Sequence, residues 1–361
     1  MINKSFILLV ISVAFFSCNQ KIEPETPEKI FEKYKSSVVL VAIEYYYEID
    51  NGNSICYYSP SSEKKIFFSK EDVLNDLSFS TGTGFIISND GEIITNKHLV
   101  NPKDENFKNE IINFYTEAKN KIFYDVQAYN DSLKQIKSNF DEYSDQLEFT
   151  EKENLSNKYE YFRERCSFLI GLYENIENIQ FENSTAKLII NRLGIAFDDT
   201  HINNFNDLQE CVVIKESNNE DVDLALIQTK SKTFNKIPDY VFNFDDNNPN
   251  ARKNSGNEKI WNINNPIKIN DDVFMIGYNK GFTLASTKQG IKSQFTSGKI
   301  SQDPKNQTRI LYTIPTLEGS SGSPIVDKWG NLIGVNFAKI TNSQNFSFGI
   351  PVREVKKFYQ E

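Results

Sequence analysis

The chain has 361 residues, and its 49 Asp and Glu outnumber its 40 Lys and Arg, which gives a net charge of −9 and a pI near 5.1. This acidic balance argues against nucleic acid as the main partner, because a phosphate backbone requires a basic face. The length suffices for one large or two medium domains, and the 28 Phe and 17 Tyr supply ample core for β-structure.

The N-terminus has the features of an export signal. Lys4 gives a positive start, residues 6–16 are an apolar run, and a small residue precedes Cys18. The run covers about half of the ~20 residues that a helix needs to cross a bilayer, so residues 1–17 are predicted to be a signal peptide. The context of Cys18 resembles a bacterial lipobox, which makes it the predicted lipidation site; a plain secretory signal is the alternative. Residues 18–34 are then expected to be a lipid anchor and polar tether.

The first predicted strands lead to a histidine. Val38–Glu48 is dense in β-branched and aromatic residues and is predicted to be a strand. Residues 50–79 form a polar insertion with two short strand-like pieces. Gly84–Ile94 contains Asn-Asp-Gly between apolar runs, which is a strong hairpin signal, and this hairpin delivers His98.

A long helical insertion is predicted over residues 101–182. Asn101 is a suitable N-cap, Pro102 follows it, and acidic residues come next. No Gly or Pro occurs from Lys103 to Ile170, and apolar residues recur at spacings of three and four, which predicts a helical hairpin with a coiled-coil-like seam. A first helix of about 45 residues would reach about 65 Å. Such an arm could dock a partner, cap a cleft or support self-association; the alternative is a self-packed hairpin with a solvated outer face.

Strand patterns resume after the insertion. His201 lies in a polar turn and is predicted to be an exposed loop residue, and residues 231–265, rich in Asn and Asp, are predicted to connect two barrels. The later predicted strands and the terminal helix are Lys187–Phe197, Leu208–Lys215, Asp223–Ile227, Val273–Tyr278, Gly290–Ile300, Arg309–Ile314, Leu332–Ala338, Phe346–Pro351 and Val352–Gln360.

Three residues make a candidate catalytic set. Ser321 lies in a small-residue turn between two strand-like runs, flanked by Gly319 and Gly322. A nucleophilic serine needs such a tight turn, where backbone N–H groups can face a developing oxyanion. His98 is the candidate base, and Asp223, at the start of a buried strand, is the candidate acid that orients it. The chain order His, Asp, Ser is one of those in which the catalytic triad is known.

Seven blocks of this sequence resemble, in order, the protease domain of the trypsin-like HtrA/Deg branch. They are Ser80–Ile87, Ile94–Val100, Asp223–Ile227, Phe274–Asn279, Phe295–Ser301, Gly319–Pro324 and Phe348–Pro351. The resemblance implies a mostly β fold of two six-stranded antiparallel β-barrels (chymotrypsin-like) over residues 35–360, with the helical hairpin inserted. It also implies that His98 is the general base, Asp223 its orienting acid and Ser321 the nucleophile, with an oxyanion hole from the backbone of Gly319, Ser320 and Ser321. The insertion at 50–79 is expected, by the same resemblance, to be a surface loop on the active-site side.

Departures from the family pattern limit what is carried over. Ser320 and Ser323 replace the usual Asn and second Gly around the nucleophile, and no PDZ-like domain is expected after Pro351. Ser320 cannot form the ion pair by which digestive relatives use a newly cut N-terminus, so no activating cleavage of that kind is expected. Pro315, six residues before Ser321, does not favour Lys or Arg specificity. A small or medium apolar side chain is the expected preference, and Glu318 at the rim is expected to disfavour acidic residues.

The sequence therefore predicts a serine endopeptidase, without cofactor or metal, acting on proteins in the bacterial cell envelope as a membrane-anchored lipoprotein that faces the periplasm or the surface. The alternative is a catalytically silent lipoprotein that binds partners through its helical arm; an esterase is a weaker third option. Cys56, Cys166 and Cys211 show no metal-binding spacing, and buried free thiols are favoured over one disulfide.

Overall fold

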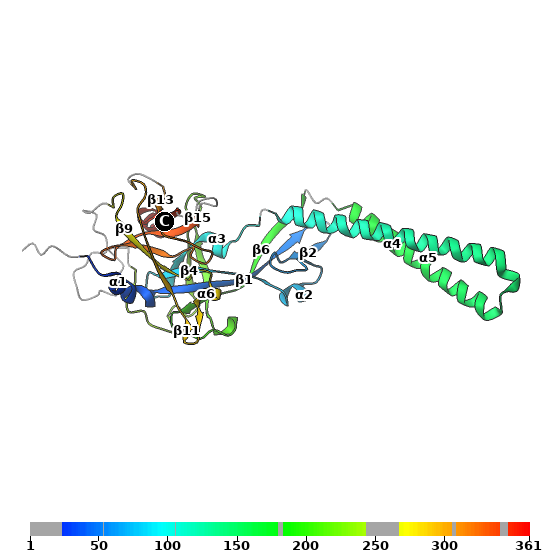
Figure 1. Cartoon of the computed structure of the whole chain (residues 1–361), viewed down its shortest axis with the longest axis horizontal. Helices are drawn as coiled ribbons and strands as arrows, with labels where there is room; N and C mark the ends of the chain where they lie inside the picture. The colour runs from blue at the N-terminus through cyan, green and yellow to red at the C-terminus, as the bar shows by residue number, and fades with distance from the viewer. Residues whose placement is uncertain are drawn as a thin grey trace, which may run out of the picture.

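The fold is taken from a computed structural model, which describes residues 24–52, 54–104, 106–179, 183–242, 267–304, 308–339 and 346–361. It consists of a β-rich body from which a long helical arm projects (Figure 1). The predicted signal peptide and Cys18 lie outside the described residues. Among the helices that are described, none has the length and apolar character that a membrane crossing requires.

Six antiparallel strands close into the first barrel. Their order is β1-β4-β5-β8-β7-β6, and β1 pairs with β6 to complete the circle. Alternate residues of β1 point to opposite faces: Val39, Val41 and Ile43 belong to the barrel interior, and Val38 and Leu40 to the core between the barrels. The strands are β1 Val38–Asp50, β4 Ser78–Ile86, β5 Glu92–Thr95, β6 Thr185–Phe197, β7 Gln209–Glu216 and β8 Ala225–Thr229.

The second sheet curls into a half-barrel. Its order is β12-β9-β14-β15-β16-β13, and an isolated bridge from Ile300 to Tyr312 links its two ends. The strands are β9 Asp272–Gly277, β12 Gln294–Lys299, β13 Ile310–Tyr312, β14 Pro324–Asp327, β15 Leu332–Lys339 and β16 Ser347–Pro351. A short helix, α6 Phe282–Ala285, and a small hairpin, β10 Ser286–Thr287 with β11 Gly290–Ile291, lie between β9 and β12. The predicted fold class, mostly β with two barrels and a helical insertion, is confirmed.

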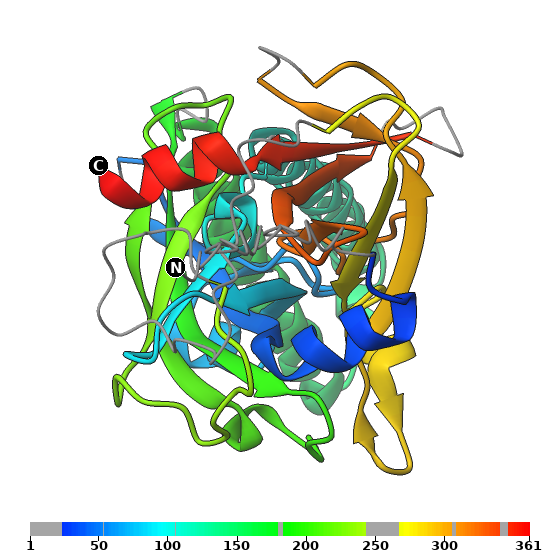
Figure 2. The same ribbon diagram turned by 90° about the vertical axis from the view of Figure 1, so that its left-hand side faces the viewer.

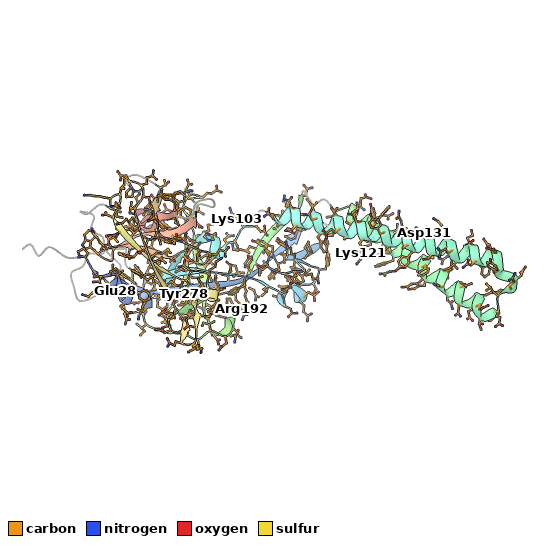
Figure 3. All side chains as sticks on the ribbon, in the orientation of Figure 1. Glu28, Lys103, Lys121, Asp131, Arg192 and Tyr278 are labelled. Carbon is orange, nitrogen blue, oxygen red and sulfur yellow. The ribbon has the colours of Figure 1, made fainter. Side chains whose placement is uncertain are left out.

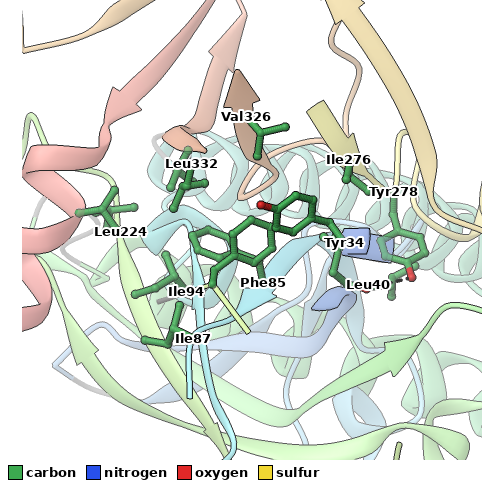
Figure 4. Packing of buried hydrophobic residues seen from close by; sticks show 14 of the residues in the cluster. Tyr34, Leu40, Phe85, Ile87, Ile94, Leu224, Ile276, Tyr278, Val326 and Leu332 are labelled. Atoms are coloured by element: carbon green, nitrogen blue, oxygen red, sulfur yellow. Dashed lines mark hydrogen bonds between the residues drawn. The ribbon is translucent and has the colours of Figure 1, made fainter. Parts of the chain in front are cut away.

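One apolar core joins the two barrels. Phe85 and Ile94 from the first and Ile276 and Val326 from the second meet in the cluster drawn in Figure 4. The terminal helix α7 Val352–Gln360 leaves the second barrel and lies across strands of the first (Figure 2). Its bounds are those predicted from the sequence. Because the core is shared, residues placed on facing strand ends of the two barrels hold a fixed relation to one another.

The predicted tether is too long at its C-terminal end. The described chain forms helix α1 Pro27–Tyr34, capped by the Thr26 side chain. Ile30 and Tyr34 are buried in the core, and the Tyr34 ring stacks on Phe242 at a centroid distance of 4.6 Å. The tether prediction for 18–34 is therefore wrong for its last eight residues, because the apolar groups of this amphipathic segment are buried against the body.

The arm is the predicted helical hairpin. It consists of α4 Phe107–Tyr143 and α5 Phe149–Glu177, and the 37 residues of α4 extend about 55 Å at 1.5 Å per residue. The helices pack against each other through pairs such as Tyr129 and Phe162, whose ring centroids are 5.4 Å apart. In Figure 3, Lys121 and Asp131 lie along this arm and Lys103 lies where it joins the body.

The predicted start of the first arm helix at Asn101 is wrong. Asn101 follows the short helix α3 Lys97–Val100, and its amide donates to Glu216 at 2.7 Å. The Pro102 carbonyl accepts from the Tyr47 hydroxyl. The Asp104 carboxylate accepts the backbone N–H of Asn106, as an N-cap side chain does. Tertiary partners therefore hold residues 101–104 in an extended path, and α4 begins at Phe107.

The insertion at 50–79 contains short strands and a helix that support the arm, and its expected place on the active-site side stays a prediction. Its elements are β2 Ile55–Tyr58, β3 Ile66–Phe67 and α2 Lys70–Leu74, and β2 pairs with the far end of β1. Phe68 packs against Phe114 with ring centroids 6.0 Å apart, and Lys65 forms an ion pair with Glu110. These contacts build the root from which the arm leaves the body (Figure 1).

The three described cysteines are free and buried, as favoured from the sequence. Cys56 lies at the arm root in β2, Cys166 in the arm helix α5 and Cys211 in the first barrel on β7. Desolvation raises the pKa of the Cys56 thiol to about 11 and that of Cys211 to about 12.

Candidate active site

Strand pairing brings His98 and Asp223 together. Thr95 at the end of β5 pairs with Ala225 at the start of β8. His98 comes three residues after Thr95, on α3, and Asp223 comes two residues before Ala225. In an antiparallel pair these two positions lie at the same end of the ladder. The amide of Asn96 also donates to the Asp223 carbonyl at 2.7 Å, which fixes the backbone at this corner.

Two contacts orient the imidazole of His98. Its Nδ1 lies 2.5 Å from Oδ2 of Asp223, and its backbone N–H donates to Oδ1 of the same carboxylate at 2.9 Å. An ionised carboxylate only accepts hydrogen bonds, so Nδ1 carries the proton and Nε2 is left with its lone pair. The His98 side chain is 45% exposed and that of Asp223 is 20% exposed, so the imidazole is more accessible than the carboxylate that orients it.

Ser321 lies in a turn whose conformation requires both flanking glycines. Gly319 has φ +87° and Gly322 has φ +85°, a region that residues with a Cβ rarely adopt. A Cβ on Gly319 would lie 2.4 Å from the Tyr278 carbonyl oxygen, and one on Gly322 would lie 2.0 Å from the Thr83 carbonyl oxygen. The predicted role of these two glycines in the turn is thus supported by their close approach to backbone.

The turn is bound to the barrel that carries His98. The Thr83 N–H donates to the Ser321 carbonyl at 2.8 Å, and the Thr83 hydroxyl donates to the Gly319 carbonyl, also at 2.8 Å. Thr83 in turn accepts, at its carbonyl, a hydrogen bond from the hydroxyl of Thr95, three residues before His98. Within the described chain, the hydrogen bond of the imidazole is to Asp223, and the Ser321 hydroxyl does not bond to it. The structure thus joins two members of the predicted triad and binds the turn of the third to the barrel that carries them.

The backbone groups expected to form an oxyanion hole are not equivalent. The N–H of Ser320 donates to the Leu317 carbonyl at 3.0 Å and is therefore occupied in this structure. The carbonyl of Glu318 accepts from Lys280 N–H, and that of Ser320 accepts from the Asn336 amide. Because C=O and N–H point in opposite directions across a trans peptide, the N–H groups of Gly319 and Ser321 face away from these anchors, and among the described residues neither donates to a protein acceptor.

Asn336 braces the turn and was not singled out from the sequence. It is 2% exposed on β15. Its amide donates to the carbonyl and hydroxyl of Ser320 at 2.9 and 3.1 Å, and its side-chain oxygen accepts from the Tyr312 hydroxyl at 2.6 Å. The available signal was a lone amide within an otherwise apolar strand, since a buried polar side chain must find partners.

Glu318 and His201 complete the predicted residues. Lys280 lies 2.7 Å from the Glu318 carboxylate and holds its pKa below the usual value. The expected repulsion of acidic substrates by Glu318 is therefore offset by a neighbouring cation. His201 is exposed in a loop, as predicted. In the described part of the chain, no group of three or more His, Cys, Asp or Glu side chains is arranged to hold a metal ion.

The two-barrel fold and the His98–Asp223 pair beside a glycine-flanked serine turn are those expected of a trypsin-like serine protease. Residues 195–335 match the family model of the trypsin-like peptidase domain. This segment includes Asp223 and Ser321 and begins after His98. Over this segment the chain is similar to trypsin-like serine proteases.

Two serine proteases of Mycobacterium tuberculosis, from strains CDC 1551 / Oshkosh and ATCC 25618 / H37Rv, are each 31% identical to this chain over 94 residues. The alignment covers 25% of this chain and 24% of each relative, so it spans about a quarter of their length. A serine endoprotease from Yersinia pestis, of known crystal structure, is 15% identical with a TM-score of 0.44, over 94% of this chain and 66% of that one. A likeness of this last degree carries no inference about activity.

Proposed function

We propose that this protein is a serine endopeptidase in which His98, Asp223 and Ser321 form the catalytic triad. One observation carries the proposal: the imidazole is fixed by Asp223 at 2.5 Å, next to a serine turn that Thr83 ties to the same barrel. Hydrogen bonds between nucleophile and base are often long in unliganded enzymes and tighten when substrate binds. The missing contact from Ser321 to the imidazole is therefore compatible with a working site.

The chemistry follows from the proton on Nδ1. Nε2 of His98 takes the proton of the Ser321 hydroxyl as its oxygen attacks the peptide carbonyl, and Asp223 stabilises the imidazolium that forms. The N–H groups of Gly319 and Ser321 are proposed to bind the oxyanion, and losing one such donor costs about 3 kcal/mol, a hundredfold or more in rate. The imidazolium then protonates the leaving amine, and water, deprotonated by the same base, hydrolyses the acyl-enzyme.

A fluorophosphonate probe tests the proposal directly. The wild-type protein should be labelled at Ser321, as mapped by peptide mass spectrometry, and should cleave a denatured protein substrate. Ser321→Ala and His98→Ala should abolish labelling, and Asp223→Asn should lower it by about 10⁴-fold, since the tautomer would be wrong. Ser323→Ala is the matched control, because the buried Ser323 hydroxyl has no hydrogen-bond partner in the structure. Labelling of wild type at another residue, or none at all, would reject the triad.

The finer assignment is to the HtrA/Deg branch, as a lipoprotein of the bacterial cell envelope. Its support is the order of the seven sequence blocks and the cysteine context at Cys18. If Cys18 carries the lipid, Cys18→Ser should move the protein from the membrane fraction to the soluble fraction and remove labelling by a fatty-acid probe. An unchanged distribution between the membrane and soluble fractions would contradict lipid anchoring and would leave the proposal of the triad unaffected.

The alternative proposal is a silent scaffold that binds a partner through the arm. It is favoured by large exposed side chains on α4 and α5, among them Tyr124 at 67% and Phe168 at 59% exposure. The two proposals separate on the fluorophosphonate experiment, since a scaffold would not react. Partner binding by the arm is also compatible with an active enzyme.

A further inference from the structure

A pocket that is lined in part by aromatic rings lies at one end of strand β4, the strand whose Thr83 binds the turn of residues 319–322, called the nucleophile turn below. Its volume is about 320 Å³, and it is lined by five apolar residues, Phe79, Phe205, Phe282, Ile202 and Leu208, and four polar ones, Glu44, Asn203, Asn204 and Ser286. We call it the aromatic side pocket. The proposed mechanism does not use it, and it lies where the core between the two barrels reaches the surface, since Phe205 and Phe282 pack against that core.

One face of strand β4 links the pocket to the nucleophile turn. Side chains two residues apart on a strand share a face, and Phe79, Thr81 and Thr83 therefore point the same way. Thr83 binds Gly319 at 2.8 Å. A Cβ built on Gly281 would lie 2.0 Å from the Thr81 hydroxyl oxygen, so the backbone before Phe282 touches this strand. Phe79 stacks on Phe282, with ring centroids 5.9 Å apart and planes 26° apart.

Residues of the second barrel also link the pocket to the nucleophile turn. Lys280 N–H donates to the Glu318 carbonyl, and the N atom of Gly281 would lie 2.5 Å from a Cβ on Gly319. Phe282 is the next residue. The segment 280–282 thus contacts the nucleophile turn at one end and walls the pocket at the other. At about 3.4 Å per strand residue, Phe79 lies roughly 13 Å along β4 from Thr83, which is a reach of about four extended substrate residues.

The aromatic rings of the pocket form one wall, and its one charged side chain is paired. Phe79 and Phe205 meet edge to face at 6.4 Å. The carboxylate of Glu44 is paired with Arg192 by two hydrogen bonds of 2.6 and 2.9 Å, and the guanidinium lies 4.5 Å from the Phe205 ring centroid. Figure 3 places Arg192 on the side of the body from which the arm leaves, which is also the side of α3 in Figure 1. Since the one acid is neutralised, the lining favours an uncharged apolar group.

We propose that the aromatic side pocket is a substrate subsite, which takes a Phe, Tyr, Trp or Leu side chain of the polypeptide within about four residues of the bond cut at Ser321. The inference rests on the proposed endopeptidase function and adds the substrate class to it. Continuity with the nucleophile turn favours the substrate itself as occupant over a lipid or a second copy of the chain. A pocket of this size, lined by rings, suits one large apolar side chain.

The test is a set of internally quenched peptides in which Phe, Leu, Ala and Glu are scanned through four positions on each side of the cleaved bond. Wild type should prefer Phe or Leu over Ala at one fixed position by about tenfold in kcat/KM, the scale of a hydrophobic side-chain contact. Phe79→Ala and Phe282→Ala should each erase most of that preference. The labelling rate of Ser321 with a small fluorophosphonate, which cannot reach the pocket, should stay unchanged in both variants. Phe149→Ala, at an 80% exposed site on the arm, is the matched control.

The outcomes are distinct. If the wild-type protein is labelled at Ser321 but prefers no apolar residue at any peptide position, the subsite proposal is overturned and the endopeptidase proposal stands. A preference that survives in both variants, or a labelling rate that falls together with the preference, also overturns it, because the rings would then act elsewhere or only support the turn. A change in oligomeric mass or in binding to phospholipid vesicles, without a change in selectivity, would assign the pocket to a different occupant and reject the proposal. A wild type that is not labelled rejects the function itself.

Discussion

The hydroxyl of Thr83 donates a hydrogen bond of 2.8 Å to the carbonyl oxygen of Gly319, a residue 236 positions later in the chain. The same oxygen accepts the backbone N–H of Tyr278 at 2.9 Å. Thr83 is completely buried and belongs to the first barrel, whereas both of its partners belong to the second. A single side chain therefore connects the Ser321 turn to the barrel that carries His98.

Replacing Thr83 by Val should both destabilise the protein and disturb the turn. The shape is nearly kept, but a buried carbonyl and a buried N–H lose their partner, which costs roughly 1–3 kcal/mol. We expect a lower midpoint in urea unfolding and slower fluorophosphonate labelling of Ser321. Thr116→Val on the arm, where the hydroxyl bonds an exposed turn of helix, should change neither. Unaltered labelling in a destabilised Thr83→Val protein would mean that the contact stabilises the fold without positioning the turn.

Asn336 should show a stronger effect of the same kind. Asn336→Asp removes the donor that holds the Ser320 carbonyl and places a carboxylate against that carbonyl in a buried site, so we expect a loss of about 2–4 kcal/mol and little labelling at Ser321. Ser320→Ala removes only a hydroxyl that bonds Leu317 and Asn336, and its effect should be smaller. Equal effects of the two variants would contradict the assignment of Asn336 as the brace. Urea unfolding and labelling rate, measured on the same samples, separate stability from positioning.

Sequence reasoning succeeded where a local pattern carries the information. The strands β1 and β5 to β9 and the helix α7 follow from periodicity and turns within a few residues, and the arm hairpin follows from its periodicity apart from the start of α4. His98 and Asp223 were correctly paired, because each lies at the end of a strand that the pattern reveals. Whether Ser321 completes the triad stays a prediction.

The predictions that failed share one cause: these residues contact partners that are distant in the sequence. Asn101 has the sequence of a helix cap, but Glu216 binds its amide. The segment before residue 35 has the polar composition of a tether, but the surroundings of Tyr34 include Phe242, more than 200 residues later. Thr83 and Asn336 carry no local motif at all, since their roles arise only when strands distant in sequence meet.

Replacing a glycine by alanine should lower the stability at Gly322 and raise it at Gly171. In Gly322→Ala the new Cβ would collide with the Thr83 carbonyl oxygen at 2.0 Å, at φ +85°, so we expect a loss of roughly 3 kcal/mol or more, or failure to fold. Gly171 lies in the middle of α5 with nothing within 4 Å of a Cβ, and Gly171→Ala should stabilise the arm by about 0.5–1 kcal/mol. Thermal unfolding measures both. A tolerated Gly322→Ala would show that the turn differs from the one described.

The buried thiols should be protected from modification in the native state. Burial raises the pKa of Cys56 to about 11 and of Cys211 to about 12. The reactive thiolate is therefore scarce at pH 8 and appears only as the pH rises toward those values. In a chain with Cys18→Ser, we expect slow reaction with Ellman's reagent at pH 8 and three fast equivalents in urea. Fast reaction of Cys211 in the folded protein would contradict its burial in the first barrel.

Shortening the arm should leave the body intact if the deletion spares the arm residues that pack against the first barrel. Ile111, Tyr115, Ile122, Leu169 and Ile176 belong to the same apolar cluster as the first barrel, so removing the whole insertion would expose that cluster. Further out, the two helices pack against each other, and the Cys166 thiol faces the Val126 carbonyl at 4.0 Å.

We therefore predict the outcome of replacing residues 127–165 by a loop of about four residues, a length that suits an antiparallel helix pair. The protein should fold, the unfolding midpoint of the body should stay within a few degrees, and Ser321 should be labelled at the wild-type rate. Selection among protein substrates or partners should change, because the exposed aromatic side chains of the outer arm are lost. Phe149→Ala alone serves as the control for a single exposed ring. Loss of labelling in a folded, shortened protein would show that the outer arm acts on the catalytic turn, which its packing against itself alone does not predict.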